Sequence, residues 1–226
     1  DDQIIFKHAN LKNSFLDGKF DGAVEFLPYF NFNLNVDLNS LNFNRLYDFL
    51  VHLEDKNKKS LFKVNKKING QLNLSVDKIF SKHTFIDSFE SRIGFTNGNI
   101  IFEQFLLNLK KLGAADITGI IQNDEKFINF KFEKNIFIDN LKRFYNRFGV
   151  HNKQNIPSNL YISGNLDLLN LNLRLHEISG DKKFIDEEMV YIEKEFNDLV
   201  LEDGYASLFN FFKLKEFIRS ITLETN

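Results

Sequence analysis

The side chains that most often carry out chemistry in proteins are few and scattered in this chain. The chain has five histidines and no cysteine, so it contains no thiol nucleophile, disulfide or cysteine-based metal site. The histidines are His8, His52, His83, His151 and His176, and no two stand at the short spacings that metal ligands use. Each is expected to be a surface or packing residue, and we expect neither a metal nor a cofactor.

Sequence motifs of the common enzyme classes are also missing. The chain contains no Walker loop, no Gly-x-Gly-x-x-Gly and no Gly-x-Ser-x-Gly. Two adjacent acidic pairs, Glu187-Glu188 and Glu202-Asp203, are better explained as solvated turns than as catalytic carboxylates. We therefore expect a protein that is not an enzyme and that has no catalytic residues.

Charge and composition indicate an ordered protein whose partner is not a nucleic acid. The net charge is -2 and 43% of the residues are hydrophobic, whereas nucleic-acid-binding domains are usually strongly basic. The 27 phenylalanines fit either lipid contact or ordinary core filling with codon bias. A lysine-rich run over residues 55–67 fits either an anionic lipid surface or, more simply, a solvated hairpin.

The stretch from Tyr29 to Arg45 has the strongest pattern in the chain, a strict alternation of apolar and polar residues. Such alternation places all apolar side chains on one face of a β-strand. The phase shifts at Asn39-Ser40, which predicts a bulge or bend that keeps the apolar side chains on the same face. The same design recurs over 68–77, 128–133 and 160–175, where the last stretch repeats the phase shift after Leu168.

Further strands and a few helices complete the expected fold. Asn97-Gly98 is the strongest hairpin signal. Additional strands are expected over 4–16, 80–93, 100–102, 105–112, 116–121, 127–138 and, as one or two strands, 184–201. Short helices are expected over 44–54 with Asn44 as N-cap, over 139–148 ending at Gly149, and over 208–221 as a closing lid. A polar linker over 150–158 marks a possible sub-boundary within one domain, 1–226.

No apolar run reaches the roughly 18 residues that a membrane-spanning helix needs. The chain opens on Asp1-Asp2-Gln3 without the features of a signal peptide. It looks like a segment of a longer protein, and any membrane anchor would lie outside it.

The order of glycine and apolar positions in the middle of the chain resembles the AsmA-like, TamB-related family of bacterial envelope proteins. The residues that carry this resemblance are Gly70-x-Leu72-x-Leu74-x-Val76, Ile86-Asp87-Ser88-Phe89, Ile93-x-Phe95-x-Asn97-Gly98-x-Ile100, Leu107-x-Leu109, Leu112-Gly113 and Ile117-Thr118-Gly119-Ile120. The stretch from Leu34 to Leu46 is similar to that family's strand-then-short-helix element. The middle quarter of the chain carries the best match.

The resemblance implies an elongated, taco-like β-groove with an apolar concave side. It also implies a periplasmic location, anchoring in the inner membrane through a region not in this chain, and a role in phospholipid movement and outer-membrane homeostasis. The fold expected is mainly β, a curved antiparallel sheet with two or three short helices. Phospholipid or another acyl-chain lipid is the expected partner, with envelope proteins possible at the groove ends.

A sheet with one continuous apolar face and few helices to cover it would leave an apolar trough. Acyl chains would gain roughly 0.8 kcal/mol per CH₂ removed from water there. The groove candidates are Phe30, Phe32, Leu34, Val36, Leu38, Leu72, Leu74, Val76, Phe130, Phe132, Leu166, Leu168, Leu171 and Leu173. Two alternatives stay open, a closed β-sandwich or barrel that binds a protein partner, and a structural scaffold without lipid.

Overall fold

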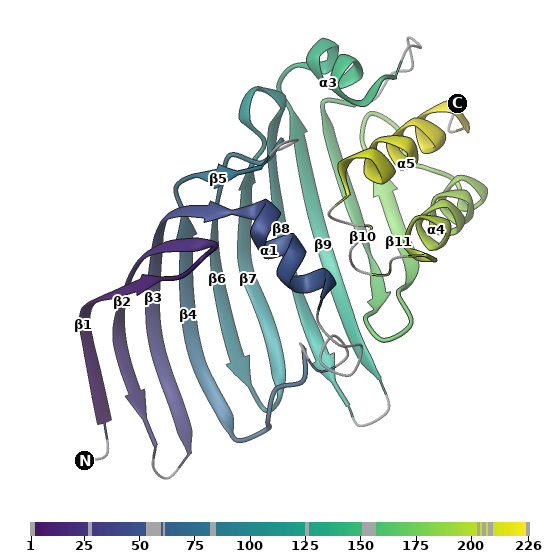
Figure 1. Cartoon of the computed structure of the whole chain (residues 1–226). Helices are drawn as coiled ribbons and strands as arrows, with labels where there is room; N and C mark the ends of the chain where they lie inside the picture. The colour runs from purple at the N-terminus through teal and green to yellow at the C-terminus, as the bar shows by residue number, and fades with distance from the viewer. Residues whose placement is uncertain are drawn as a thin grey trace.

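The fold was obtained as a computed structural model, which describes residues 3–26, 29–52, 60, 62–81, 85–124, 127–150, 157–202, 204, 207 and 210–224. Its elements are drawn in Figure 1. The strands are β1 (Gln3–Lys12), β2 (Leu16–Glu25), β3 (Phe30–Asn42), β4 (Ile68–Val76), β5 (Ile79–Phe80), β6 (Ser88–Thr96), β7 (Asn99–Asn108), β8 (Gly113–Asn123), β9 (Ile128–Ile138), β10 (Asn159–Asp167) and β11 (Asn172–Ser179). The helices are α1 (Phe43–Val51), the 3-10 helix η1 (Lys110–Leu112), α3 (Leu141–Phe148), α4 (Asp186–Val200) and α5 (Phe211–Glu224).

All the strands belong to one curved, open sheet, so the mainly β prediction is confirmed (Figure 1). The order is β1-β2-β3-β4-β6-β7-β8-β9-β10-β11, with β5 beside the end of β3. β1 and β11 do not pair with each other, so the described strands form neither a closed barrel nor a two-sheet sandwich. The possible boundary at 150–158 interrupts no pairing, since β9 and β10 on either side of it are neighbours.

The sheet is mixed, and the expectation of an antiparallel sheet was wrong at β3, which pairs in parallel with β4 and, at its end, with β5. β3 and β4 are parallel, with Leu34 opposite Leu72. The connection between them includes α1 and returns the chain to the end of the sheet where β3 began, which a parallel neighbour requires. On their polar side the two strands are joined by side chains. Asn73 Nδ2 donates to Asn35 Oδ1 at 2.7 Å, and Ser75 Oγ donates to Asp37 Oδ1 at 2.6 Å.

The predicted bulge in β3 is confirmed. Asp17 of β2 lies opposite Ser40 while Gly18 lies opposite Leu38, so Asn39 is the additional residue. The bulge returns Leu41 to the side of Leu38, and both are buried in the same cluster. The hairpin at Asn97-Gly98 is also confirmed, with φ values of 51° and 81° that suit a tight turn between twisted strands.

The second phase shift, after Leu168, is a turn and not a bulge within one strand. Residues 168–171 connect β10 to β11. The carboxylate of Asp167 accepts hydrogen bonds from the backbone N–H groups of Leu169 at 2.8 Å and Asn170 at 3.1 Å. An aspartate that accepts from the residues two and three positions later is a turn signal. Because leucines both precede and follow Asp167, the apolar pattern continues across this turn and the turn was not predicted.

The prediction of one or two strands over 184–201 was wrong, because this segment forms α4. Its first turn is acidic, and Glu188 accepts a 3.0 Å hydrogen bond from the backbone N–H of Ile185, which caps the N-terminus of the helix. Met189 and Ile192 are buried against β11 at helical spacing. With α4 there are four α-helices among the described residues, where two or three were expected.

The other helices lie close to their expected positions. α1 starts at Phe43, and the Asn42 side chain, not Asn44, accepts from the Arg45 N–H at 3.2 Å. α3 stops at Gly149, as expected, and its start is capped by Asn140. The expected end of α1 at residue 54 and start of α5 at residue 208 lie outside the described residues, as do residues 55–59 and 61 of the lysine-rich run. Residues 110–112 of an expected strand form η1.

Within the described part of the chain, no helix has the length and apolar character needed to cross a bilayer.

Candidate functional site

One face of the sheet is apolar from β1 to β11, and the strand register shows how the sequence builds it. Residues directly opposite on neighbouring strands point to the same face. Leu34 of β3 lies opposite Gly22 of β2 and Leu72 of β4, and Leu72 lies opposite Ile93 of β6. The same row continues through the later strands to Leu175 of β11. We call this side of the sheet the apolar face.

The structure places twelve of the fourteen predicted groove residues on the apolar face. Four of the fourteen are buried, namely Leu38, Val76, Leu168 and Leu173. The other ten are only partly buried. Leu168 and Leu171 lie in the turn between β10 and β11 and belong to no strand.

Three core clusters cover separate parts of the apolar face. The first, around Leu38 and Val76, lies beneath Phe43 and Leu46 of α1. The second, around Ile100 and Ile121, lies beneath the segment that carries Phe62 and Val64. The third lies between β10–β11 and helices α4 and α5. The elements that complete the core therefore stand at the ends of the strands and over the last strands of the sheet.

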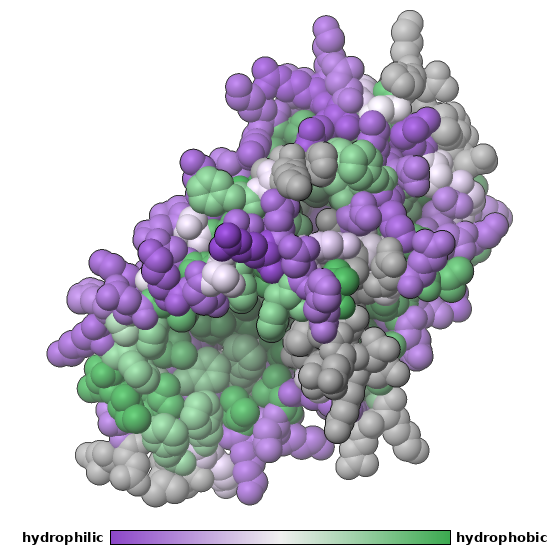
Figure 2. Space-filling view, in the orientation of Figure 1, coloured by the Kyte–Doolittle hydropathy of each residue, from purple (hydrophilic) through white to green (hydrophobic). Residues whose placement is uncertain are grey.

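A part of the apolar face on and beside β1 to β4 belongs to none of these clusters, and we call it the open region. Its members are Phe6, Phe20, Phe26, Phe30, Phe32, Leu34 and Leu72, none of which is buried or belongs to a cluster. Figure 2 shows hydrophobic side chains gathered in a hollow at the lower left, where Figure 1 places the lower parts of β1 to β4. Phenylalanines follow one another across it, with ring centroids 5.1 Å apart for Phe6–Phe20 and 5.2 Å apart for Phe32–Phe95.

Glycines on the apolar face make room for the rings beside them. A Cβ atom on Gly70 would lie 2.6 Å from the Phe32 ring and 2.5 Å from its carbonyl oxygen. The arrangement recurs where Gly119 lies beside the Phe130 ring. A phenylalanine can therefore lie flat over the neighbouring strand, which widens the apolar surface.

Lys134 is the exception on the apolar face, and sequence reasoning missed it. It lies in β9 directly between Ile117 and Ile162. Burial lowers the pKa of Lys134, because the ammonium loses water without gaining an ion pair in the described structure. The signal was present in the sequence, since the alternation from Phe130 through Phe132 leads directly to Lys134 and then Ile136.

The opposite, polar face offers little chemistry. A shallow hollow of about 410 Å³ is lined by Asn35, Asp37, Asn73 and Ser75, which hydrogen-bond to one another across β3 and β4. Among the described residues, no group of three or more His, Asp or Glu side chains could hold a metal ion. The open region is the better candidate site, and what it can do is bind apolar groups.

Comparison with protein-family models, with curated proteins and with solved structures finds no match to this chain. Its function must therefore be inferred from the site.

Proposed function

We propose that this chain binds phospholipid acyl chains along its apolar face, as a non-catalytic segment of an envelope protein that conducts lipid between membranes. The observation that carries the proposal is the partial exposure of Phe32, Leu34 and Leu72 on β3 and β4, which have neighbouring strands on both sides. Central strands of an ordinary domain are covered on their apolar side. Contiguous exposed apolar surface is typical of an interaction site.

Acyl chains suit this surface better than a polar ligand does. The open region consists of phenylalanine and leucine side chains, so it offers shape and hydrophobicity but no hydrogen-bonding specificity. Each CH₂ transferred from water contributes roughly 0.8 kcal/mol. The proposal includes a periplasmic location, an inner-membrane anchor outside this segment and protein partners at the groove ends, all of which the resemblance to AsmA-like proteins implies.

The first experiment places charge on the apolar face and compares it with equal charge on the polar face. Leu34 and Leu72 lie opposite each other, and so do Asn33 and Gln71 next to them. Native mass spectrometry of protein purified from bacterial membranes would detect bound phospholipid. We expect Leu34→Asp with Leu72→Asp to abolish it, and Asn33→Asp with Gln71→Asp to retain it, because only the first pair brings carboxylates to the acyl chains.

A second experiment avoids the risk that the charged variant does not fold. Phe32 is replaced by p-benzoylphenylalanine, which keeps an aromatic ring in the open region, and Phe137, exposed on the polar face, is replaced as the control. Irradiation in cells should attach phospholipid at position 32 and not at position 137. Equal labelling at both positions, or a folded wild-type protein free of lipid, would favour the scaffold without lipid cargo.

A further inference from the structure

A basic pocket lies at one end of the sheet, where β7 ends and β8 begins. Its volume is about 880 Å³. Four of the side chains that line it are cationic, Lys110, Lys111, Arg143 and Arg147, and one is anionic, Asp87. Positive charge is thus concentrated here in a chain whose net charge is -2. Converging cations in a concave site are typical of sites that bind anions.

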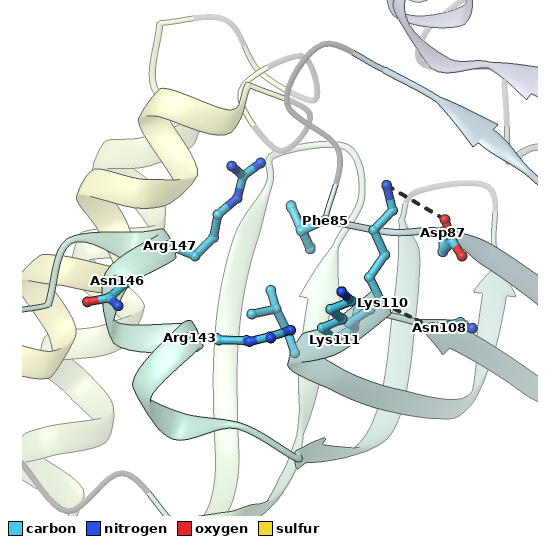
Figure 3. A pocket seen from close by; sticks show the side chains of 10 residues that line it. Phe85, Asp87, Asn108, Lys110, Lys111, Arg143, Asn146 and Arg147 are labelled. Carbon is cyan, nitrogen blue, oxygen red and sulfur yellow. Dashed lines mark hydrogen bonds and ion pairs between the residues drawn. The ribbon is translucent and has the colours of Figure 1, made fainter.

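Two elements far apart in the sequence bring these cations together. Arg143 and Arg147 are one turn apart on the same side of α3, whose start is set by Asn140 accepting from the Arg143 N–H at 2.9 Å. Lys110 and Lys111 lie in η1, where Asn108 Oδ1 accepts from the Lys110 N–H at 2.9 Å. Figure 3 shows Arg143 extending from α3 toward Lys111.

Backbone hydrogen bonds hold the two walls in place. The N–H of Asp139, just before α3, donates to the carbonyl of Leu112 in η1 at 2.9 Å. The N–H of Asp87 donates to the carbonyl of Asn108 at 2.8 Å. The backbone segments that carry the cations are therefore braced, and a ligand would have to order only their side chains.

The charges of the pocket are not balanced within it. Lys110 Nζ lies 3.6 Å from Asp87 Oδ1 (Figure 3), and the Arg147 guanidinium lies 4.5 Å from the centre of the Phe211 ring. In the described part of the chain, Lys111 and Arg143 have no ion pair. Lys111 and Arg143 can therefore donate hydrogen bonds to a ligand. A guanidinium and an ammonium together suit the oxygens of a phosphate group.

Phe85 connects this pocket to the apolar interior. Its ring lines the pocket and lies 5.9 Å from the Phe148 ring and 6.4 Å from the Phe211 ring. The next residue, Ile86, packs on the first core cluster of the apolar face. A ligand with a charged end and an apolar end would meet both the cations and the Phe85 ring in this pocket.

We propose that this pocket binds a phosphate-bearing group, with Arg143 and Lys111 as its principal contacts. This inference deepens the proposed function. If the phosphate belongs to a phospholipid, the inference rests on the proposed function: the phosphate would sit at the pocket while the acyl chains enter the apolar face. Inorganic phosphate shares the same chemistry and is the other source.

The test compares dihexanoylphosphatidic acid, dihexanoylglycerol and inorganic phosphate by calorimetry and native mass spectrometry. The two lipids share acyl chains and differ by the phosphate. We expect wild-type protein to bind the phosphatidic acid about tenfold more tightly than the glyceride at low salt, with a smaller difference at high salt. Arg143→Gln with Lys111→Gln should reduce that ratio to roughly twofold or less while glyceride binding is unchanged.

The matched control is Arg92→Gln with Lys131→Gln, which removes one arginine and one lysine from exposed positions elsewhere on the sheet. An equal loss in the control, or equal affinity of the wild type for both lipids with no binding of inorganic phosphate, would overturn the proposal. Binding of inorganic phosphate through Arg143 and Lys111 without either lipid would support the pocket and contradict the proposed function. Phosphatidic acid binding without inorganic phosphate binding would identify the headgroup as the source.

Discussion

The carboxylate of Glu193 on α4 accepts a 2.6 Å hydrogen bond from the backbone N–H of Leu175 on β11. Its other oxygen accepts from Arg174 Nη1 at 3.2 Å, and the side chain is buried. The contact joins a helix that covers the apolar face to the last strand of the sheet. It therefore helps to determine where the apolar face is closed.

Glu193→Ala should destabilise the fold by about 1–3 kcal/mol, because it leaves the Leu175 N–H without its partner in a partly buried place. Urea unfolding followed by circular dichroism measures the change. Glu195→Ala, on the same helix, is the control and should stay within about 0.5 kcal/mol. Equal effects of the two substitutions would show that the carboxylate does not hold α4 to β11.

Gly70→Ala should destabilise the sheet by about 1–3 kcal/mol, because the new methyl group would overlap the Phe32 ring and carbonyl. Gly94→Ala is the control, since its Cβ would meet only side-chain atoms at 3.5 Å or beyond. Thermal unfolding of both variants tests the prediction. A Gly70→Ala protein as stable as Gly94→Ala would mean that Phe32 moves aside at no cost.

Lys134→Met should stabilise the protein near neutral pH by more than the roughly 0.5 kcal/mol that surface substitutions reach. Burial holds the folded pKa of Lys134 below its ordinary value of 10.5, so the unfolded chain binds the extra proton. The free energy of unfolding of the wild type therefore includes a Lys134 contribution that rises with pH between the pKa of Lys134 in the folded protein and 10.5. The gain from Lys134→Met should shrink over that range.

Urea unfolding at a series of alkaline pH values compares the wild type with Lys134→Met and with Lys131→Met, an exposed lysine on the other face of the same strand. Lys131→Met is the control for the loss of one lysine from this strand. A Lys134→Met difference that is independent of pH would contradict a lowered pKa of Lys134 in the folded protein.

Asp167→Asn should remove a stabilising contribution that is present at neutral pH. Burial raises the pKa of Asp167, but hydrogen bonds from Asn170 and Leu169 outweigh it and hold the pKa below its ordinary value of 3.8. The contribution is complete above that value and is lost as pH falls through the folded pKa. Acid unfolding should thus show the variant approaching the wild type below pH 3.8. Asp181→Asn, exposed in the next turn, should differ little from the wild type throughout.

Local patterns identified much of this fold. The alternation over 30–38, the bulge at Asn39 and the hairpin at Asn97-Gly98 depend on one strand and its immediate neighbours, so the sequence contains them directly. The errors arose where apolar residues are dense. In 184–201 and after Leu168, leucine and phenylalanine fit both periods, and the deciding signals were the Glu188 capping contact and the Asp167 turn.

The sequence by itself determined that the strands are one-sided and which residues form the apolar face, because side-chain direction alternates with residue number. Only the tertiary structure decided which part of that face is covered. The parallel pairing of β3 with β4, the position of α4 and α5 over β10–β11, and the meeting of α3 with η1 at the basic pocket all join segments distant in the chain. Such contacts depend on how the whole sheet curves and on which helix reaches which strand, and no local period of the sequence encodes them.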